Sequence, residues 1–335
     1  MSSVQVRYQA GSDTEIPIID IGPYLRGDPG ALERTARLVG EASESLGFFY
    51  LFNHGVSQSL IDRTFRETER FHSLPLDRKM EVKVLANNIG YLPLGGQTQR
   101  SYQSLYGESR HPDRSASFFA RAEYAADHPD RLAKKSWVYD NRWPPELPEF
   151  RETCLEYFDA LTRLAEKVLE LQSAALGLGP GFIPSHDAFS PPVHILRLLH
   201  YPTRDPALEG QFGIGPHTDY GYGSILAQAR VPGLEIYTRD GNWIEAPALP
   251  GHLLFNNGDM CKVWTNERLR SAPHRVINKS GEARYSIPFF VSTRLDVPLA
   301  CLPTCQGPGN PPKYTPITYG EHYARLKSQN FDLPK

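Results

Sequence analysis

Two histidines and one aspartate stand at spacings that suit a metal site. His217 and Asp219 are separated by one residue, so in a strand their side chains point to the same face. A second histidine, His274, opens a later β-branched segment. Two neutral imidazoles and one carboxylate are the donor set typical of non-haem Fe(II) sites, which keep the remaining positions on the ion open. Because one carboxylate leaves the ion with net positive charge, such a site favours an anionic chelating ligand.

Each of these residues also has a plainer interpretation. Asp219 precedes Tyr220 and Gly221 and fits a turn, while His274 alone fits an ordinary strand. The metal interpretation therefore depends on further residues that would bind the anionic ligand.

Such residues follow ten positions after His274. Arg284 and Ser286 share one face of the segment RYSIPFFV, which we expect to form a hairpin with the strand that begins at His274. A planar guanidinium beside a hydroxyl fits a carboxylate, through paired charge-assisted bonds and one neutral donor. A solvated hairpin charge is the alternative for Arg284, but the apolar run that follows indicates that the strand enters a core.

The N-terminal part of the chain predicts alternating strands and helices. The apolar run at 16–21 predicts a buried strand, and apolar residues at helical spacing predict a helix over 32–46. A second buried strand is expected within 48–56, followed by a helix over 57–72.

The character of the chain then changes twice. Residues 86–146 are rich in glycine, proline and charge, and we interpret them as a long irregular stretch that supplies the lid of a site. An apolar stripe over 148–176 predicts a long amphipathic helix. From 193 onward, short β-branched and aromatic segments alternate with turns, which favours an all-β sandwich or barrel.

We therefore predict a mainly β protein with flanking helices, in which a helical and mixed N-terminal half buttresses a jelly-roll barrel. The predicted parts are an N-terminal mixed α/β region with lid loops at 16–130, a buttressing helix at 148–178, a jelly-roll core at 193–300 and a C-terminal segment at 301–335.

Charge and composition narrow the range of partners. The 36 basic and 38 acidic residues give a net charge of −2, which argues against a nucleic-acid or membrane-surface binder. The sequence contains no run of about 18 apolar residues, so we expect no transmembrane helix. The first residues also lack the apolar core of a secretory signal. Four cysteines do not make a disulfide scaffold, so we expect reduced thiols and a cytoplasmic protein.

Together these motifs resemble the Fe(II)/2-oxoglutarate-dependent dioxygenases, and more closely their isopenicillin N synthase-like family. The resemblance is carried by H-T-D at 217–219, a second histidine 55 residues after Asp219, and R-x-S ten residues further on. The segments GFFYLFNHGV (47–56), LRLLHYP (196–202) and 231–276 are also similar to that family. The similarity covers about residues 16 to 325 and implies a double-stranded β-helix fold.

The resemblance implies a role for each matching residue. His217, Asp219 and His274 would bind iron, and Arg284, Ser286 and Tyr201 would bind the distal carboxylate of 2-oxoglutarate. The chain departs from the family at Leu199, where a polar asparagine is the family's residue. No catalytic residue beyond the metal ligands is implied.

The implied activity is an oxidoreductase of secondary metabolism. It would couple oxidative decarboxylation of 2-oxoglutarate by O2 to the oxidation of a small molecule, by hydroxylation, desaturation or cyclisation. Two alternatives fit the same residues. One is an isopenicillin N synthase-type iron oxidase that does not use 2-oxoglutarate, and the other is a non-catalytic member that binds a small molecule. The oligomeric state is left open.

Four residues are candidates for contact with the substrate: Arg197, Phe118, Phe119 and Phe290. Arg197 should share the inward face of its strand with Tyr201, and an arginine inside a barrel needs an anionic partner. The three phenylalanines would line an apolar pocket or, in the plainer interpretation, belong to the core.

Overall fold

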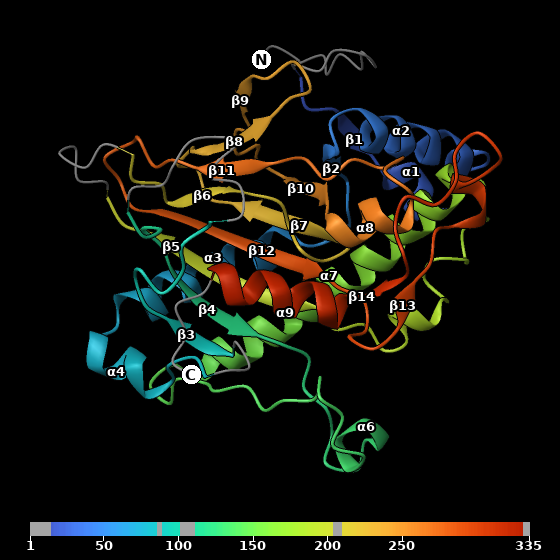
Figure 1. Ribbon diagram of the computed structural model, residues 1–335. Helices are drawn as coiled ribbons and strands as arrows, with labels where there is room; N and C mark the ends of the chain where they lie inside the picture. Colours follow the sequence, from blue (N-terminus) through green and yellow to red (C-terminus); the bar gives the residue numbers. More distant parts are fainter. Residues whose placement is uncertain (1–14, 86–88, 101–110, 204–209, 331–335) are drawn as a thin grey trace.

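The computed structural model describes residues 15–85, 89–100, 111–203 and 210–330, and two β-sheets that face each other form its centre (Figure 1). The strands are β1 (Ile18–Asp20), β2 (Phe48–Phe52), β3 (Gly90–Leu92), β4 (Ala116–Ala120), β5 (Ile195–Tyr201), β6 (Ile214–His217), β7 (Gly223–Gln228), β8 (Leu234–Tyr237), β9 (Trp243–Glu245), β10 (His252–Asn257), β11 (His274–Val276), β12 (Arg284–Val291), β13 (Pro298–Leu299) and β14 (Ile317–Thr318). The α-helices are α1 (Gly22–Leu25), α2 (Ala31–Ser45), α3 (Gln58–Ser73), α4 (Leu76–Glu81), α6 (Pro129–Leu132), α7 (Pro148–Ala175), α8 (Asp259–Trp264) and α9 (Tyr319–Asn330).

The larger sheet has eight strands in the order β1-β2-β10-β7-β12-β5-β4-β3, and the smaller has four in the order β6-β11-β8-β9. Among the paired strands that the structure describes in these two sheets, β1 and β2 alone run parallel. Strands from the N-terminal half flank both edges of the larger sheet.

The predicted fold, a mainly β jelly-roll barrel with flanking helices, is confirmed. The four-part division of the chain stays a prediction.

Alternate side chains of the larger sheet enter two different environments. On β2, Phe49 and Leu51 pack into a core with α2, α3 and α7, whereas Phe48 and Tyr50 face the smaller sheet. This follows from the two-residue period of a strand. The sheet therefore has a helix-covered face and a face toward the smaller sheet.

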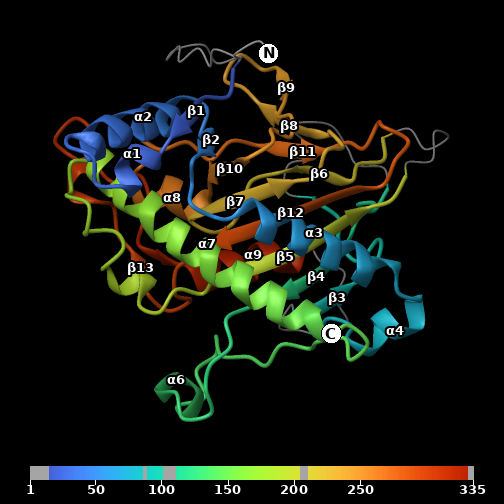
Figure 2. The ribbon, with the colours of Figure 1, turned by 180° about the vertical axis from the view of Figure 1, so that it is seen from behind.

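The long helix α7 covers the first of these faces. It spans 28 residues and crosses the back of the larger sheet beside α2 and α3 (Figure 2). Its buried stripe includes Phe150, Cys154, Tyr157, Leu161 and Leu164. The predicted helix over 148–176 is thus confirmed to within one residue. Within the described ranges, no helix combines the length and apolar character needed to cross a membrane.

The prediction of an irregular stretch over 86–146 is wrong in part. β3 and β4 pair with each other, and β4 extends the larger sheet by pairing with β5. All five residues of β4 are buried. The segment ASFFA is short and follows a polar, charged loop, so its strand pattern does not stand out in the sequence.

The predicted hairpin between His274 and Arg284 is also wrong. β11 pairs with β6 and β8 in the smaller sheet, while β12 lies between β5 and β7 in the larger one. The connection 277–283 crosses from one sheet to the other. Arg284 therefore faces His274 across the space between the sheets rather than along a shared ladder.

Candidate active site

The pairing of β6 with β11 brings the two histidines together. His217 ends β6, and its antiparallel partner is His274, the first residue of β11; their ring centroids are 4.2 Å apart. Nδ1 of His217 lies 2.8 Å from the Gly215 carbonyl oxygen, and Nδ1 of His274 lies 3.2 Å from that of Ala272. A ring that donates from Nδ1 keeps the lone pair of Nε2 for a metal ion.

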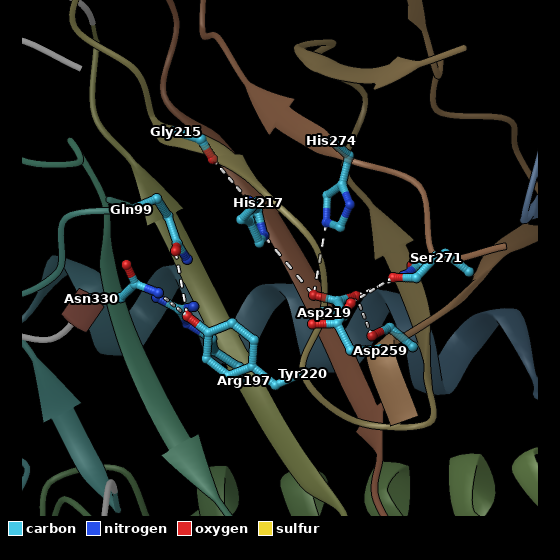
Figure 3. A network of polar contacts seen from close by, with 12 residues as sticks. Gln99, Arg197, Gly215, His217, Asp219, Tyr220, Asp259, Ser271, His274 and Asn330 are labelled. Carbon is cyan, nitrogen blue, oxygen red and sulfur yellow. Dashed lines mark hydrogen bonds and ion pairs between the residues drawn. The ribbon is translucent and has the colours of Figure 1, made fainter. Parts of the chain in front are cut away.

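Asp219 reaches the histidines from a turn. β6 ends at His217 and residues 218–222 lead to β7, so the expectation that His217 and Asp219 share a strand face is wrong. Oδ1 of Asp219 nevertheless lies 3.9 Å from Nε2 of His217 and 3.8 Å from Nε2 of His274 (Figure 3). The three ligand atoms lie within 4.8 Å of one another. These separations are too long for hydrogen bonds and suit donors arranged around one ion.

The start of α8 holds this turn in place. The backbone amides of Asp259 and Gly258 donate to the carbonyl oxygens of Asp219 and Tyr222, both at 2.8 Å. A Cβ on Gly258 would come within 2.3 Å of the Gly221 carbonyl oxygen, so this approach requires glycine. The position of the carboxylate is thus fixed by backbone contacts.

The carboxylate is also oriented and kept ionised. Oδ2 of Asp219 accepts hydrogen bonds from Ser224 Oγ at 2.5 Å and Asn256 Nδ2 at 2.7 Å, which leaves Oδ1 for the histidine side. Burial raises the pKa of Asp219, but the two histidines and these hydrogen bonds outweigh it, and the net pKa is lowered. Burial is the main cause that lowers the pKa of His217 to about 3. A neutral imidazole and an ionised carboxylate are the forms that bind metals.

One cavity lies between the two sheets beside this triad. Its lining includes Leu199, Tyr201, Leu234, Arg284, Ser286 and Phe290. Arg284 and Ser286 both face it, as their two-residue spacing predicts. Nη2 of Arg284 donates to Gln228 Oε1 at 2.9 Å, and its Cζ lies 4.9 Å from the ring centroid of Tyr201.

The guanidinium of Arg284 is left with open donors. The side chain is 1% exposed, and its Nε and Nη1 have no hydrogen-bond partner among the described residues. Burial lowers the pKa of Arg284, which shows the cost of the desolvated charge. A carboxylate in the cavity would accept from the open donors along one edge of the guanidinium and offset that cost.

A second cavity opens from the same triad toward α9. The two cavities share Arg197, His217, Asp219 and Phe290. The second is also lined by Gln97, Gln99, Phe119, Ile195, Tyr319 and Tyr323.

Three of the four predicted substrate residues line the second cavity: Arg197, Phe119 and Phe290. Phe118 does not, and its prediction is wrong. Its ring packs in the helix-covered core, with centroids 4.9 Å from Phe71 and 5.0 Å from Phe150. The alternation of β4 sends Phe118 and Phe119 to opposite faces of the sheet.

The contribution of α9 was not predicted from the sequence. Tyr319 and Tyr323 are one helical turn apart and both line the second cavity, a spacing that could have drawn attention to this face. Asn330, at the end of α9, donates from Nδ2 to the Tyr220 hydroxyl at 2.6 Å (Figure 3). Its own carbonyl oxygen accepts from the Thr98 amide at 2.9 Å. The last turn of α9 thus ties the segment after β3 to the connection that carries Asp219.

Two family models match the chain. One, described as the N-terminal part of a non-haem dioxygenase in morphine synthesis, matches residues 16–146, and the 2OG-Fe(II) oxygenase superfamily model matches residues 192–293. A 2-oxoglutarate-Fe(II) type oxidoreductase, hxnY, from Emericella nidulans is 34% identical over 96% of this chain and 94% of its own length. A homoarginine-6-hydroxylase from Oryza sativa subsp. japonica is 30% identical over 96% of this chain and 99% of its own.

Solved structures agree with these matches. A full-length protein from Neurospora crassa, solved in complex with alpha-KG and thymine, superimposes with a TM-score of 0.82 at 26% identity, over 94% of this chain and 97% of that one. JOX2 in complex with 2OG, Fe and JA superimposes with a TM-score of 0.76 at 28% identity, over 93% of this chain and 85% of that one.

Proposed function

The chain belongs to the 2OG-Fe(II) oxygenase superfamily, and from this premise we propose which of its residues carry the reaction. It is an Fe(II)- and 2-oxoglutarate-dependent dioxygenase that couples oxidation of 2-oxoglutarate by O2 to oxidation of a small molecule. The relatives with 2-oxoglutarate in their names do not favour the alternative of an iron oxidase without this cosubstrate.

His217, Asp219 and His274 hold the iron in this proposal. Support comes from the convergence of their donor atoms, from the Nδ1 contacts that free both Nε2 atoms, and from the hydrogen bonds that orient Asp219. When bound, the iron supplies a site where a keto acid and O2 meet and electrons are transferred.

Arg284, Ser286 and Tyr201 bind the distal carboxylate of 2-oxoglutarate. The single observation that carries this assignment is the pair of open donors on the buried Arg284, in a cavity that also reaches His217 and Asp219. Ser286 adds a hydroxyl on the same face. Tyr201 presents the face of its ring to the guanidinium and so orients the fork.

The substrate occupies the cavity toward α9, beside the iron ligands. Phe119 and Phe290 exclude water from one side, and Tyr319 and Tyr323 cover it from α9. Thymine and JA in the similar structures are small molecules, which supports a substrate of that size. A cytoplasmic location and a role in secondary metabolism belong to the same proposal; the free thiols of Cys154, Cys261, Cys301 and Cys305 fit a reducing compartment.

Anaerobic titration of 2-oxoglutarate into the Fe(II) protein tests this function. We expect the metal-to-ligand absorption band of the keto-acid chelate to appear in the wild type and to vanish in Asp219→Ala. Succinate production in air is the second readout. A wild type that binds iron but shows neither the band nor succinate would contradict the proposal.

A further inference from the structure

The cavity toward α9 contains a second buried arginine that binding of iron and 2-oxoglutarate leaves unused. Arg197 is 5% exposed and forms no ion pair within the described part of the chain. The carboxylates that influence it are those of Asp113 and Asp219. Asp113 accepts from the backbone amides of Gly215 and Gln99, and burial raises its pKa to about 7. Asp219 is turned toward the histidines, so the charge of Arg197 is only partly compensated.

Three contacts fix the orientation of this guanidinium. Its Nε donates to Ser117 Oγ at 2.9 Å, and its Nη2 donates to Gln97 Oε1 at 2.8 Å. Its Cζ lies 4.8 Å from the ring centroid of Phe119. The guanidinium therefore lies over the ring of Phe119, and Nη1 makes no hydrogen bond to the described residues.

Gln97 adds a second open donor to the cavity that Arg197 lines. Because an arginine only donates, the oxygen of the Gln97 amide must face Arg197, and its Nε2 points elsewhere. No hydrogen bond to the described residues uses this Nε2. Neither Nε2 nor the Arg197 Nη1 is among the fully buried unsatisfied atoms, and both side chains line the cavity toward α9. The two donors thus open on that cavity.

Aromatic and apolar side chains form part of the wall of this cavity. The sheet contributes Phe119, Ile195 and Phe290, and α9 contributes Tyr319 and Tyr323. Aromatic walls favour a ring, and two donors on the same cavity favour oxygen acceptors at its edge.

We propose that Arg197 and Gln97 bind the oxygen-bearing edge of a flat, ring-containing substrate and so determine the specificity of the enzyme. This inference rests on the proposed function, in which the same cavity receives the substrate. A carboxylate on the ring is the acceptor expected from the buried positive charge; a ring carbonyl has the same hydrogen-bonding chemistry without the charge.

The position of Gln97 separates this role from cosubstrate binding. Arg197 lines both cavities, but Gln97 lines only the cavity toward α9. The pair therefore meets a ligand on the substrate side, while Arg284 serves the other cavity.

Calorimetric titration of matched probes into the anaerobic Fe(II) protein tests the proposal, with and without 2-oxoglutarate. The probes are benzoate and benzamide, indole-3-acetate and indole-3-acetamide, and thymine. We expect at least one carboxylate to bind about tenfold or more tightly than its amide, as one lost charge-assisted bond implies. Thymine binding that depends on Arg197, without carboxylate binding, would support the proposal with a ring carbonyl as the acceptor.

Three variants assign the effect to the pair. Arg197→Gln should weaken the preferred probe by about 10- to 100-fold and leave the 2-oxoglutarate dissociation constant unchanged. Gln97→Glu hardly changes the size of the side chain but places a carboxylate within reach of Arg197. This variant should abolish the preference for the carboxylate probe. Arg294→Gln is the control, because Arg294 pairs with Asp296 and stacks on Trp137 outside both cavities.

Other results would overturn the proposal. These are binding of no probe to the wild type, equal binding of each carboxylate and its amide without thymine binding, or unchanged probe affinity in Arg197→Gln. A loss of 2-oxoglutarate binding in Arg197→Gln, with probe binding intact, would also overturn it. Failure of the wild type to bind 2-oxoglutarate contradicts the proposed function instead, and the titrations without cosubstrate still test the pair.

Discussion

The two faces of the larger sheet differ in how their side chains are used: one face is packed with apolar groups, and the other presents polar groups to cavities. On the helix-covered face, Phe49, Phe118 and Phe289 are fully buried in apolar packing with α2, α3 and α7. On the opposite face, Arg197 and Arg284 keep donors that no described residue satisfies, and the carboxylate of Asp219 lines a cavity beside them. Since both faces come from the same strands, one set of backbone ladders supports a stabilising core and a reactive pocket. Changes on one face should therefore affect stability, and changes on the other should affect ligand binding.

The largest expected effect belongs to the metal ligands. Asp219→Ala should abolish Fe(II)-dependent turnover and weaken iron binding by more than the roughly 10- to 100-fold typical of outer-shell partners. Iron content and succinate production measure this. Asp219→Glu should also be poor, because its longer side chain displaces the oxygen in a site that tolerates only small shifts. Full activity and iron content in Asp219→Ala would remove the metal assignment.

The next effect separates charge from shape in the cosubstrate cavity. Arg284→Ala removes two charge-assisted bonds of about 1.5–3 kcal/mol each, so 2-oxoglutarate binding should fall by several kcal/mol. Arg284→Lys keeps the charge without the planar fork and should lose less, about tenfold for each 1.4 kcal/mol. Iron binding should survive in both variants. A titration of Arg284→Ala that matches the wild type would contradict the assignment.

Neighbouring residues of β4 compare the two faces directly. Phe118→Ala should lower the free energy of unfolding by about 3–5 kcal/mol, because it leaves a hole in the helix-covered core. Phe119→Ala should cost less stability, since its ring already borders a cavity, and should impair substrate oxidation instead. Urea unfolding and succinate production measure the two effects. Equal stability losses in the two variants would contradict the division between the faces.

A titratable group on the core side should make stability depend on pH. Burial lowers the pKa of His194 from 6.5 to about 3, and its Nδ1 accepts from the Ser292 amide at 3.1 Å. As the pH falls, His194 therefore binds a proton in the unfolded chain before it does so in the folded chain. The stabilisation that neutral His194 provides is complete above pH 6.5 and is lost as the pH falls toward 3. At pH 5 the loss should be about 2 kcal/mol.

His194→Asn tests this source of acid sensitivity, because an amide oxygen can accept from Ser292 without titrating. The variant should be less stable than the wild type at pH 7.5 but should lose less stability on going to pH 5. The free energy of unfolding in urea at both pH values provides the comparison. If the variant loses as much stability between pH 7.5 and pH 5 as the wild type, His194 is not the source of the acid sensitivity. The remaining candidates are then His54, His72 and His200, whose pKa values burial also lowers.

The smallest expected effect concerns Tyr201. Its hydroxyl is at most one neutral donor, so Tyr201→Phe should weaken 2-oxoglutarate binding by about 1 kcal/mol or less. The Michaelis constant for 2-oxoglutarate in this variant and in Arg284→Ala tests the ranking. A larger effect from Tyr201→Phe would reverse it.

Local periodicity predicted the parts of the molecule that depend on near neighbours. The stripe of α7 and the shared face of Arg284 and Ser286 follow from spacings of three to four and of two residues. The triad residues were also identified from their types and spacing. The predicted strand position of Asp219 was wrong, however, because the residue lies in the connection between β6 and β7. That connection is held by α8, and no pattern near Asp219 reveals the contact.

Sheet membership and long-range closure could not be predicted from the sequence. Whether β12 follows β11 in a hairpin or crosses to the other sheet depends on strands far away in the chain. The face toward which Phe118 points likewise depends on the register between β4 and β5. The role of α9 depends on contacts of Asn330 with Thr98 and Tyr220, more than 100 residues away in each case.

The late position of α9 in the chain has a consequence for how the enzyme is made. β12 ends at Val291, so a growing polypeptide contains every proposed iron and cosubstrate ligand before α9 is translated. Tyr319 and Tyr323 join the cavity only after that point. Synthesis therefore supplies the proposed iron and cosubstrate ligands first, and α9, which adds two tyrosines to the wall of the substrate cavity, after them.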